Sequence, residues 1–140
     1  MRIYKRVVLL LTCLLSSFFI DAQEVFLVDE NFKSKNFKDY INVYQTKDSI
    51  NPNILLNNNT IIWEKNKVSY GFSTNFFWLK FKIKNQEDET KRFYLELDNP
   101  HLRYVEFYES IDSQLVLKYR CGRHLPFDYR PVDNVKFVFP

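Results

Sequence analysis

The strongest constraint on the fold is a regular alternation of apolar and polar residues in the second half of the chain. Leu79, Phe81 and Ile83 alternate with lysines, which is the two-residue period of a β-strand with one buried and one solvated face. The same period returns in residues 93–98, after a polar stretch at residues 85–91. We therefore predict an antiparallel hairpin in which the lysine row lies beside an acidic row.

Further short strands are expected at intervals of about ten residues. Apolar residues alternate in 105–107 and 115–119 across a polar turn at 110–113, another run begins at Val135, and residues 25–28 favour β structure. The 14 Phe, 9 Tyr and 2 Trp suit pleated, half-buried surfaces. We predict a single all-β domain, an antiparallel, jelly-roll-like β-sandwich.

Two stretches of the N-terminal half depart from the strand pattern. Residues 48–59 contain Pro52 and five Asn, which predicts turns in a surface connection. Four residues are spaced as on one face of a helix, which predicts a short helix in the N-terminal third: Phe37, Tyr40, Ile41 and Tyr44.

Residues 1–22 have the layout of a signal peptide, with three cations, an apolar run and the small residue Ala22 at a cleavage point. The apolar run is shorter than the roughly 20 residues of a membrane span, and an uncleaved anchor is the alternative. A lipoprotein cleavage box at Cys13 is disfavoured because Thr12 precedes it. The mature domain is then 23–140, exported to the periplasm or the exterior, or membrane-anchored if the segment stays uncleaved.

The net charge and the number of cysteines exclude some classes of function. Removing three of 20 cations and one of 17 acids with the signal peptide leaves a net charge of +1, without the basic footprint of a nucleic-acid binder. Cys121 is left without an intramolecular partner, so we expect a buried thiol, with a disulfide to another chain as the alternative. Because the chain stops at Pro140 within an alternating run, we expect the domain to be incomplete at its C-terminus.

Three blocks of residues carry a family resemblance. They are Gly71–Ser73 with Phe77–Phe81 and Asn85; Tyr94–Leu97 with Asn99, Pro100 and Val105–Tyr108; and Gly122 with Leu125–Phe127, Arg130, Pro131 and Phe137–Phe139. In this order they resemble the extracellular, periplasmic domain of bacterial seven-transmembrane receptors with diverse intracellular signalling modules. The resemblance implies a jelly-roll-like sensor that binds carbohydrate or a related small molecule, placed before a membrane bundle and an output module. This chain has neither, so a truncated gene, a fragment and a soluble relative stay open.

Aromatic rings and loop donors are the candidate ligand-binding groups, since a flat ring matches the C–H face of a pyranose and loops on a rigid sheet often build recognition sites. By parity, Trp78 shares its face with Lys80, and the Gly122–Pro131 loop supplies donors suited to hydroxyls or a carboxylate. The candidates are Trp63, Trp78, Tyr94, Tyr104, Tyr108, Arg123, His124 and Arg130. The alternatives are that the tryptophans cover the second sheet or a loop and that Arg130 pins its loop through a salt bridge.

Catalysis and metal binding are not expected. Glu96 and Glu106 offer the paired carboxylates of glycoside hydrolysis, but no second feature converges on them. Cys121, His101 and His124 are too few for a metal site, and no cofactor is predicted. We expect a ligand-sensing, carbohydrate-binding receptor module, with a secreted structural or protein-interaction β-domain as the alternative. An exposed strip of two or more of the five candidate rings would favour the first; burial of all five would favour the second.

Overall fold

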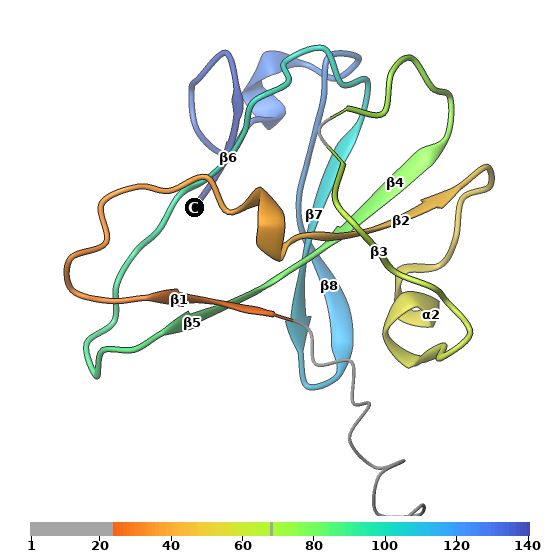
Figure 1. Ribbon diagram of the computed structural model, residues 1–140. Helices are drawn as coiled ribbons and strands as arrows, with labels where there is room; N and C mark the ends of the chain where they lie inside the picture. The colour runs from red at the N-terminus through yellow and green to blue at the C-terminus, as the bar shows by residue number, and fades with distance from the viewer. Residues whose placement is uncertain (1–23, 68) are drawn as a thin grey trace, which may run out of the picture.

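A computed structural model describes residues 24–67 and 69–140, and the predicted signal peptide at 1–22 lies outside them. The elements are β1 (Val25–Val28), the 3-10 turn η2 (Lys38–Tyr40), β2 (Asn42–Thr46), α2 (Pro52–Asn57), β3 (Glu64–Lys65), β4 (Phe76–Lys80), β5 (Lys82–Asn85), β6 (Leu95–Leu97), β7 (Val105–Ile111), β8 (Gln114–Cys121), the 3-10 turn η3 (Phe127–Tyr129) and β9 (Phe137–Phe139) (Figure 1). The arrangement is an all-β sandwich with a short helix, which confirms the predicted fold class.

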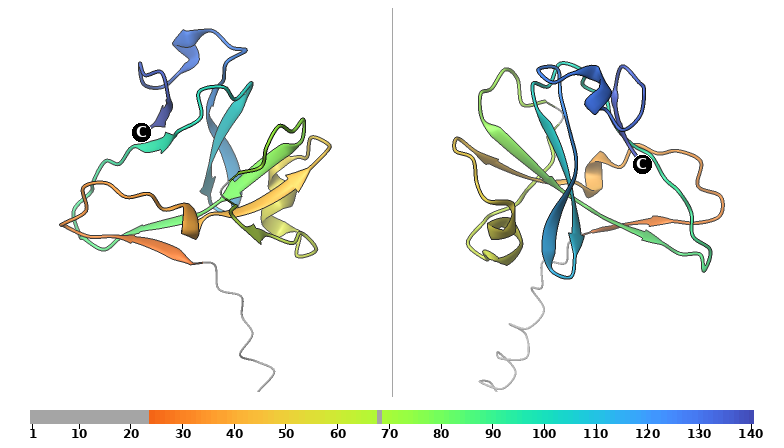
Figure 2. Two further views of the ribbon diagram at one scale, coloured as in Figure 1. Left: turned by 45° about the horizontal axis from the view of Figure 1, so that its top comes forward. Right: turned by 180° about the vertical axis from the view of Figure 1, so that it is seen from behind.

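The strands form small sheets rather than one continuous surface. β3, β2 and β4 make a three-stranded sheet, while β1–β5, β6–β9 and β7–β8 are pairs. The β7–β8 hairpin lies between the β3–β2–β4 sheet and the β6–β9 pair in both views of Figure 2. The β1–β5 pair is parallel, unlike the others. It departs from the antiparallel prediction because a long crossover separates these two strands in the sequence.

The alternating runs on either side of the predicted polar turn at 110–113 form the antiparallel β7–β8 hairpin. Its two-residue turn, Asp112 and Ser113, has φ values of 48° and 61°, which are the positive values of the tight turns that match the twist of paired strands. The register shifts between Phe107 and Tyr108, where an extra residue of β8 bulges out.

The predicted hairpin between the runs at 79–84 and 93–98 is wrong. The first run divides into β4 and β5, which pair with β2 and β1, and β6 pairs with β9. Leu79 and Ile83, expected inside, are each 44% exposed. The reason is that a two-residue period separates the faces of a strand without specifying its partner or the face that meets the core.

One core cluster lies between the β7–β8 hairpin and the β6–β9 pair. It centres on Cys121, Phe137 and Phe139. The ring of Phe139 stacks on that of Phe107, with centroids 5.1 Å apart and an interplanar angle of 12°. Cys121 is buried as a free thiol, as expected, and burial raises its pKa.

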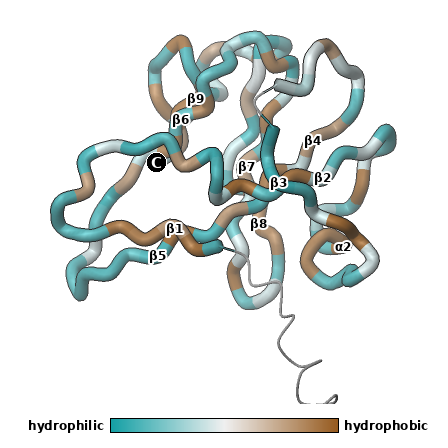
Figure 3. Tube along the Cα trace, in the orientation of Figure 1, coloured by the Kyte–Doolittle hydropathy of each residue, from teal (hydrophilic) through white to brown (hydrophobic). Residues whose placement is uncertain are grey.

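A second cluster surrounds Phe26 on β1, a strand that is brown along most of its length in Figure 3. The Phe26 ring contacts those of Phe32, Phe37 and Tyr40 at centroid distances of 5.6, 5.4 and 5.2 Å. These contacts hold η2, a single helical turn within the segment predicted to be helical. The turn does not reach Tyr44, because that residue pairs in β2.

The α-helix instead falls in the segment predicted as turns. The Asn51 side chain accepts a hydrogen bond from the Asn53 N–H at 3.0 Å, and Pro52 occupies the first helical position. These two local signals outweigh the turn preference of the surrounding asparagines. Leu55 then anchors the helix by burying its side chain.

We predict that Phe137→Ala lowers the free energy of unfolding by about 3 to 5 kcal/mol, because it opens a cavity in the core. Phe137 is 0% exposed, whereas the nearby Val135 is 71% exposed. Val135→Ala is therefore the matched control and should change stability by less than about 0.5 kcal/mol. Urea denaturation measures both, and equal effects would contradict this description of the core.

Candidate ligand-binding site

Two segments meet at the end of the β7–β8 hairpin opposite its turn (Figure 1). Residues 101–104 precede β7 and residues 122–126 follow β8, and we call them the loop pair. Val105 and Cys121 are the last paired residues of the hairpin at this end. The loop pair is therefore carried on two strands whose inner face belongs to the core.

Backbone contacts hold the loop pair together. The Arg123 N–H donates to the Leu102 carbonyl at 2.8 Å, and the His124 N–H donates to the Arg103 carbonyl at 3.2 Å. Gly122 is buried with φ of +146°, and a Cβ there would overlap the Arg103 carbonyl group. Glycine is thus required where the two segments cross closely.

The loop pair brings three of the predicted site residues together. Tyr104 is 64% exposed, and its ring meets the His124 ring edge to face, with centroids 5.6 Å apart and an angle of 80°. Arg123, the neighbour of His124, is also exposed. The arrangement combines an accessible aromatic ring with imidazole and guanidinium donors on one rigid support.

Three other predicted residues lie in an aromatic strip, which comprises Tyr44, Trp63, Trp78 and Tyr108, all half-buried. Tyr44 and Trp78 are directly paired across β2 and β4, so they share one face. Trp63 lies 6.1 Å from Tyr44, and Tyr108 lies 5.8 Å from Trp78, between ring centroids. The strip thereby joins the β3–β2–β4 sheet to the hairpin.

Charged groups border the strip at both ends. The Lys80 ammonium lies 4.3 Å from the centroid of the Trp63 ring. At the other end Glu106 accepts from the Tyr108 hydroxyl at 2.5 Å and from Arg120 Nε at 2.8 Å. Burial, and then the hydrogen bond to Glu106, raise the pKa of Tyr108 to about 12.

Trp78 Nε1 is buried and has no hydrogen-bond partner within the described residues. An unmet donor of this kind is uncommon in a folded interior. Lys80 already contacts the Trp63 ring and Glu106 the Tyr108 hydroxyl, and all four rings of the strip are half-buried. The strip is therefore better suited to packing between the sheet and the hairpin than to an open binding surface.

The two remaining predicted residues lie elsewhere. Arg130 has its guanidinium 4.7 Å from the rings of both Phe127 and Phe137, and its Nη1 donates to the carbonyls of Asn134 and Val135. Arg130 thus pins its loop through carbonyls and rings rather than through the salt bridge considered from the sequence. Tyr94 is 59% exposed before β6, and no ring contact within the described residues joins it to the other candidates.

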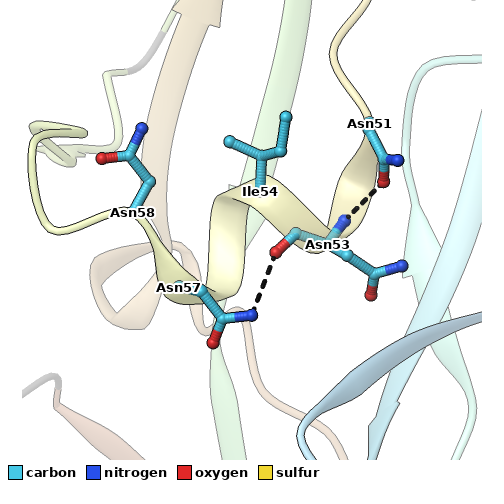
Figure 4. A pocket seen from close by; sticks show the side chains of 5 residues that line it. All are labelled: Asn51, Asn53, Ile54, Asn57 and Asn58. Carbon is cyan, nitrogen blue, oxygen red and sulfur yellow. Dashed lines mark hydrogen bonds between the residues drawn. The ribbon is translucent and has the colours of Figure 1, made fainter.

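An open depression of about 430 Å³ lies against α2, apart from the predicted site residues (Figure 4). It is lined by Asn51, Asn53, Ile54, Asn57 and Asn58. Several of these amides already stabilise the helix: Asn57 Nδ2 donates to the Asn53 carbonyl at 3.4 Å, and Asn53 Oδ1 accepts from the Leu115 N–H at 2.9 Å. The depression therefore owes its shape to the attachment of α2 to β8.

The carboxylates considered for catalysis have separate partners. Glu96 contacts Lys136 Nζ at 2.7 Å, and Glu106 is held by Tyr108 and Arg120. Among residues 24–67 and 69–140, His, Cys, Asp and Glu side chains form no group of three suited to a metal ion.

Several residues at these sites were missed in the sequence. Tyr44 was assigned to a helix face, and residues 42–46 carry no apolar alternation that would have placed it in a strand. Lys80 was noted only as a neighbour of Trp78 by parity, and Arg120 follows from the β7–β8 register, in which it is opposite Glu106. The Arg103 carbonyl accepts a hydrogen bond that links the two segments of the loop pair. Nothing in the sequence marks this residue apart from its position before β7.

Comparison with known families gives a match over residues 16–140 to the family described as 7TMR-DISM extracellular 2. The chain belongs to this family. The kinship inferred from the three sequence blocks is thus confirmed. Members of the family are extracellular domains of membrane receptors with intracellular modules, which supports an extracellular sensing role for this 7TMR-DISM domain. No curated protein and no solved structure matches the chain. In the part of this 7TMR-DISM domain that the structure describes, no helix is both long enough and apolar enough to span a bilayer.

We predict that Gly122→Ala destabilises the domain by about 2 to 4 kcal/mol, because the added Cβ would approach Tyr104 Cα to 2.7 Å at a backbone angle that side chains rarely adopt. Gly71 also has a positive φ, of 61°, but nothing lies within 4 Å of its added Cβ. Gly71→Ala should therefore cost only about 1 kcal/mol. Thermal denaturation compares the two, and an equal loss would show that the loop pair is not closely packed.

We predict that the contribution of Tyr108 to stability depends on pH. Its folded pKa of about 12 exceeds the ordinary value of 10.0, so its contribution to stability is complete below pH 10.0 and is lost as the pH rises to about 12. The difference in unfolding free energy between the wild type and Tyr108→Phe should shrink across this window. Urea denaturation at a series of alkaline pH values measures it, and a constant difference would refute the assignment.

Proposed function

We propose that this receptor domain recognises a carbohydrate at the loop pair and catalyses no reaction. The observation that carries the proposal is the Tyr104 ring, which is 64% exposed although it packs against the His124 ring. An exposed ring of this kind supplies a flat apolar face for the C–H side of a pyranose. Arg123 and His124 supply donors for the hydroxyls around the ring.

The rigidity of the support favours binding. The two backbone hydrogen bonds of the loop pair and the close crossing at Gly122 fix the backbone that carries these side chains before a ligand arrives. A ligand then loses less free energy in ordering its site. Glu96 and Glu106 are engaged by other side chains, which supports a binding role rather than a hydrolytic one.

The second candidate function is protein interaction. It is favoured by Phe127 and Tyr129 on η3, whose side chains are exposed close to the loop pair in sequence. Exposed aromatic residues are enriched at protein interfaces. Neither condition set from the sequence is met. Tyr94 and Tyr104 are exposed, so the five candidate rings are not all buried, but no ring contact within the described residues joins these two into one strip.

The test is a glycan-array screen of the full chain, followed by measurement of the dissociation constant for the glycan that binds most tightly. Tyr104→Ala should weaken binding by about tenfold or more, because stacking is lost. Tyr94→Ala removes an equally exposed ring elsewhere and should leave the constant unchanged. Circular dichroism checks that both variants fold. Binding that survives Tyr104→Ala, or that depends equally on Tyr94, would refute the proposed site.

A further inference from the structure

We infer that the loop pair selects an anionic saccharide, namely one that carries a carboxylate on its pyranose ring, as uronic acids do. This inference rests on the proposed function and narrows its ligand class. It starts from the composition of the two segments, in which residues 101–104 and 122–126 contain two Arg and two His but no Asp or Glu. All four side chains, of His101, Arg103, Arg123 and His124, are exposed.

The positive charge of the loop pair is not neutralised by neighbouring carboxylates. Among the ion pairs of the described residues, none includes Arg103 or Arg123. Glu96 and Asp98 precede the loop pair in sequence, and both already form ion pairs with Lys136. Its Nζ lies 2.7 Å from Glu96 and 3.0 Å from Asp98. The next acid in sequence after the loop pair, Asp128, lies in η3.

The rest of the hairpin behaves differently. On β7 and β8 the cations Lys118 and Arg120 are paired with Glu109 and Glu106, at 3.1 and 2.8 Å. Charge is therefore balanced along the strands and left unbalanced at the loop pair, within a domain whose overall charge is close to neutral. A local excess of this kind attracts anions and increases their rate of association.

Guanidinium groups match the geometry of a carboxylate, because their paired N–H donors bind both of its oxygens. In a uronic acid the carboxylate is attached directly to the sugar ring. One such ligand uses the exposed Tyr104 ring and an arginine at the same time, whereas a neutral sugar uses only the ring and weaker hydrogen bonds to hydroxyls.

The experiment measures binding of the full chain to oligomers of galacturonate, glucuronate and mannuronate, and to the methyl ester of each, by calorimetry. At least one acid should bind about tenfold more tightly than its ester. Raising the salt concentration should reduce this preference, because exposed charges are screened. Inorganic phosphate is the control for simple anion attraction, and it should not displace the saccharide at equal concentration.

The variants separate the inference from the proposed function. Arg103→Gln and Arg123→Gln should each reduce the preference for the acid severalfold, while Arg92→Gln, at an exposed arginine outside the loop pair, should leave it unchanged. Equal affinity for acid and ester that still depends on Tyr104 would overturn the inference and leave the proposed function standing. Binding that phosphate displaces, and that Tyr104→Ala does not weaken, would overturn both. Failure of every uronic acid to bind, beside a neutral glycan that does, would also overturn the inference.

Discussion

The ring of Phe139 stacks on that of Phe107, 5.1 Å away, and this contact attaches the last strand to the central hairpin. Phe137 and Cys121 fill the space beside it with fully buried side chains. Small two-stranded sheets are only marginally stable alone, so each pair depends on a shared apolar face. The Phe107 contact belongs to the apolar cluster that β6–β9 and β7–β8 share, and this cluster also packs against Leu102 of the loop that precedes β7.

The loop pair gains its geometry from this core in two ways. Cys121 is the last paired residue of β8, so the adjoining Gly122 emerges at a fixed place and crosses Arg103 closely. Arg130 lies against the rings of Phe127 and Phe137 and thereby ties the segment after the loop pair to the same core. The exposed candidate binding residues thus lie directly next to strands whose aromatic side chains form the core, as is common where loops are carried on a rigid sheet.

Local signals predicted some elements well and others poorly. The strands β7 and β8 and the polar turn between them followed from the alternation of their residues, and a two-residue turn joins such strands as a hairpin. The run that contains Leu79 had the same period, but its partners are far away in the sequence, so the predicted pairing and buried face were both wrong. At the candidate site, Tyr104, Arg123 and His124 were recognised by residue type. Arg103 was missed, because its relevance depends on a backbone contact that no pattern records.

By itself the sequence determined the strand-rich composition, the polar turn at 110–113, the buried character of Cys121 and the family to which the chain belongs. These depend on local conformational preference and on hydrophobic periodicity, which are properties of neighbouring residues. Only the tertiary structure decided that Trp78 packs on Tyr108 while Tyr104 stays exposed beside His124. Tyr104 and Tyr108 lie an even number of positions apart, so the sequence places both side chains on the same face. Their exposure differs because a neighbouring sheet covers one end of that face and leaves the other end open to solvent.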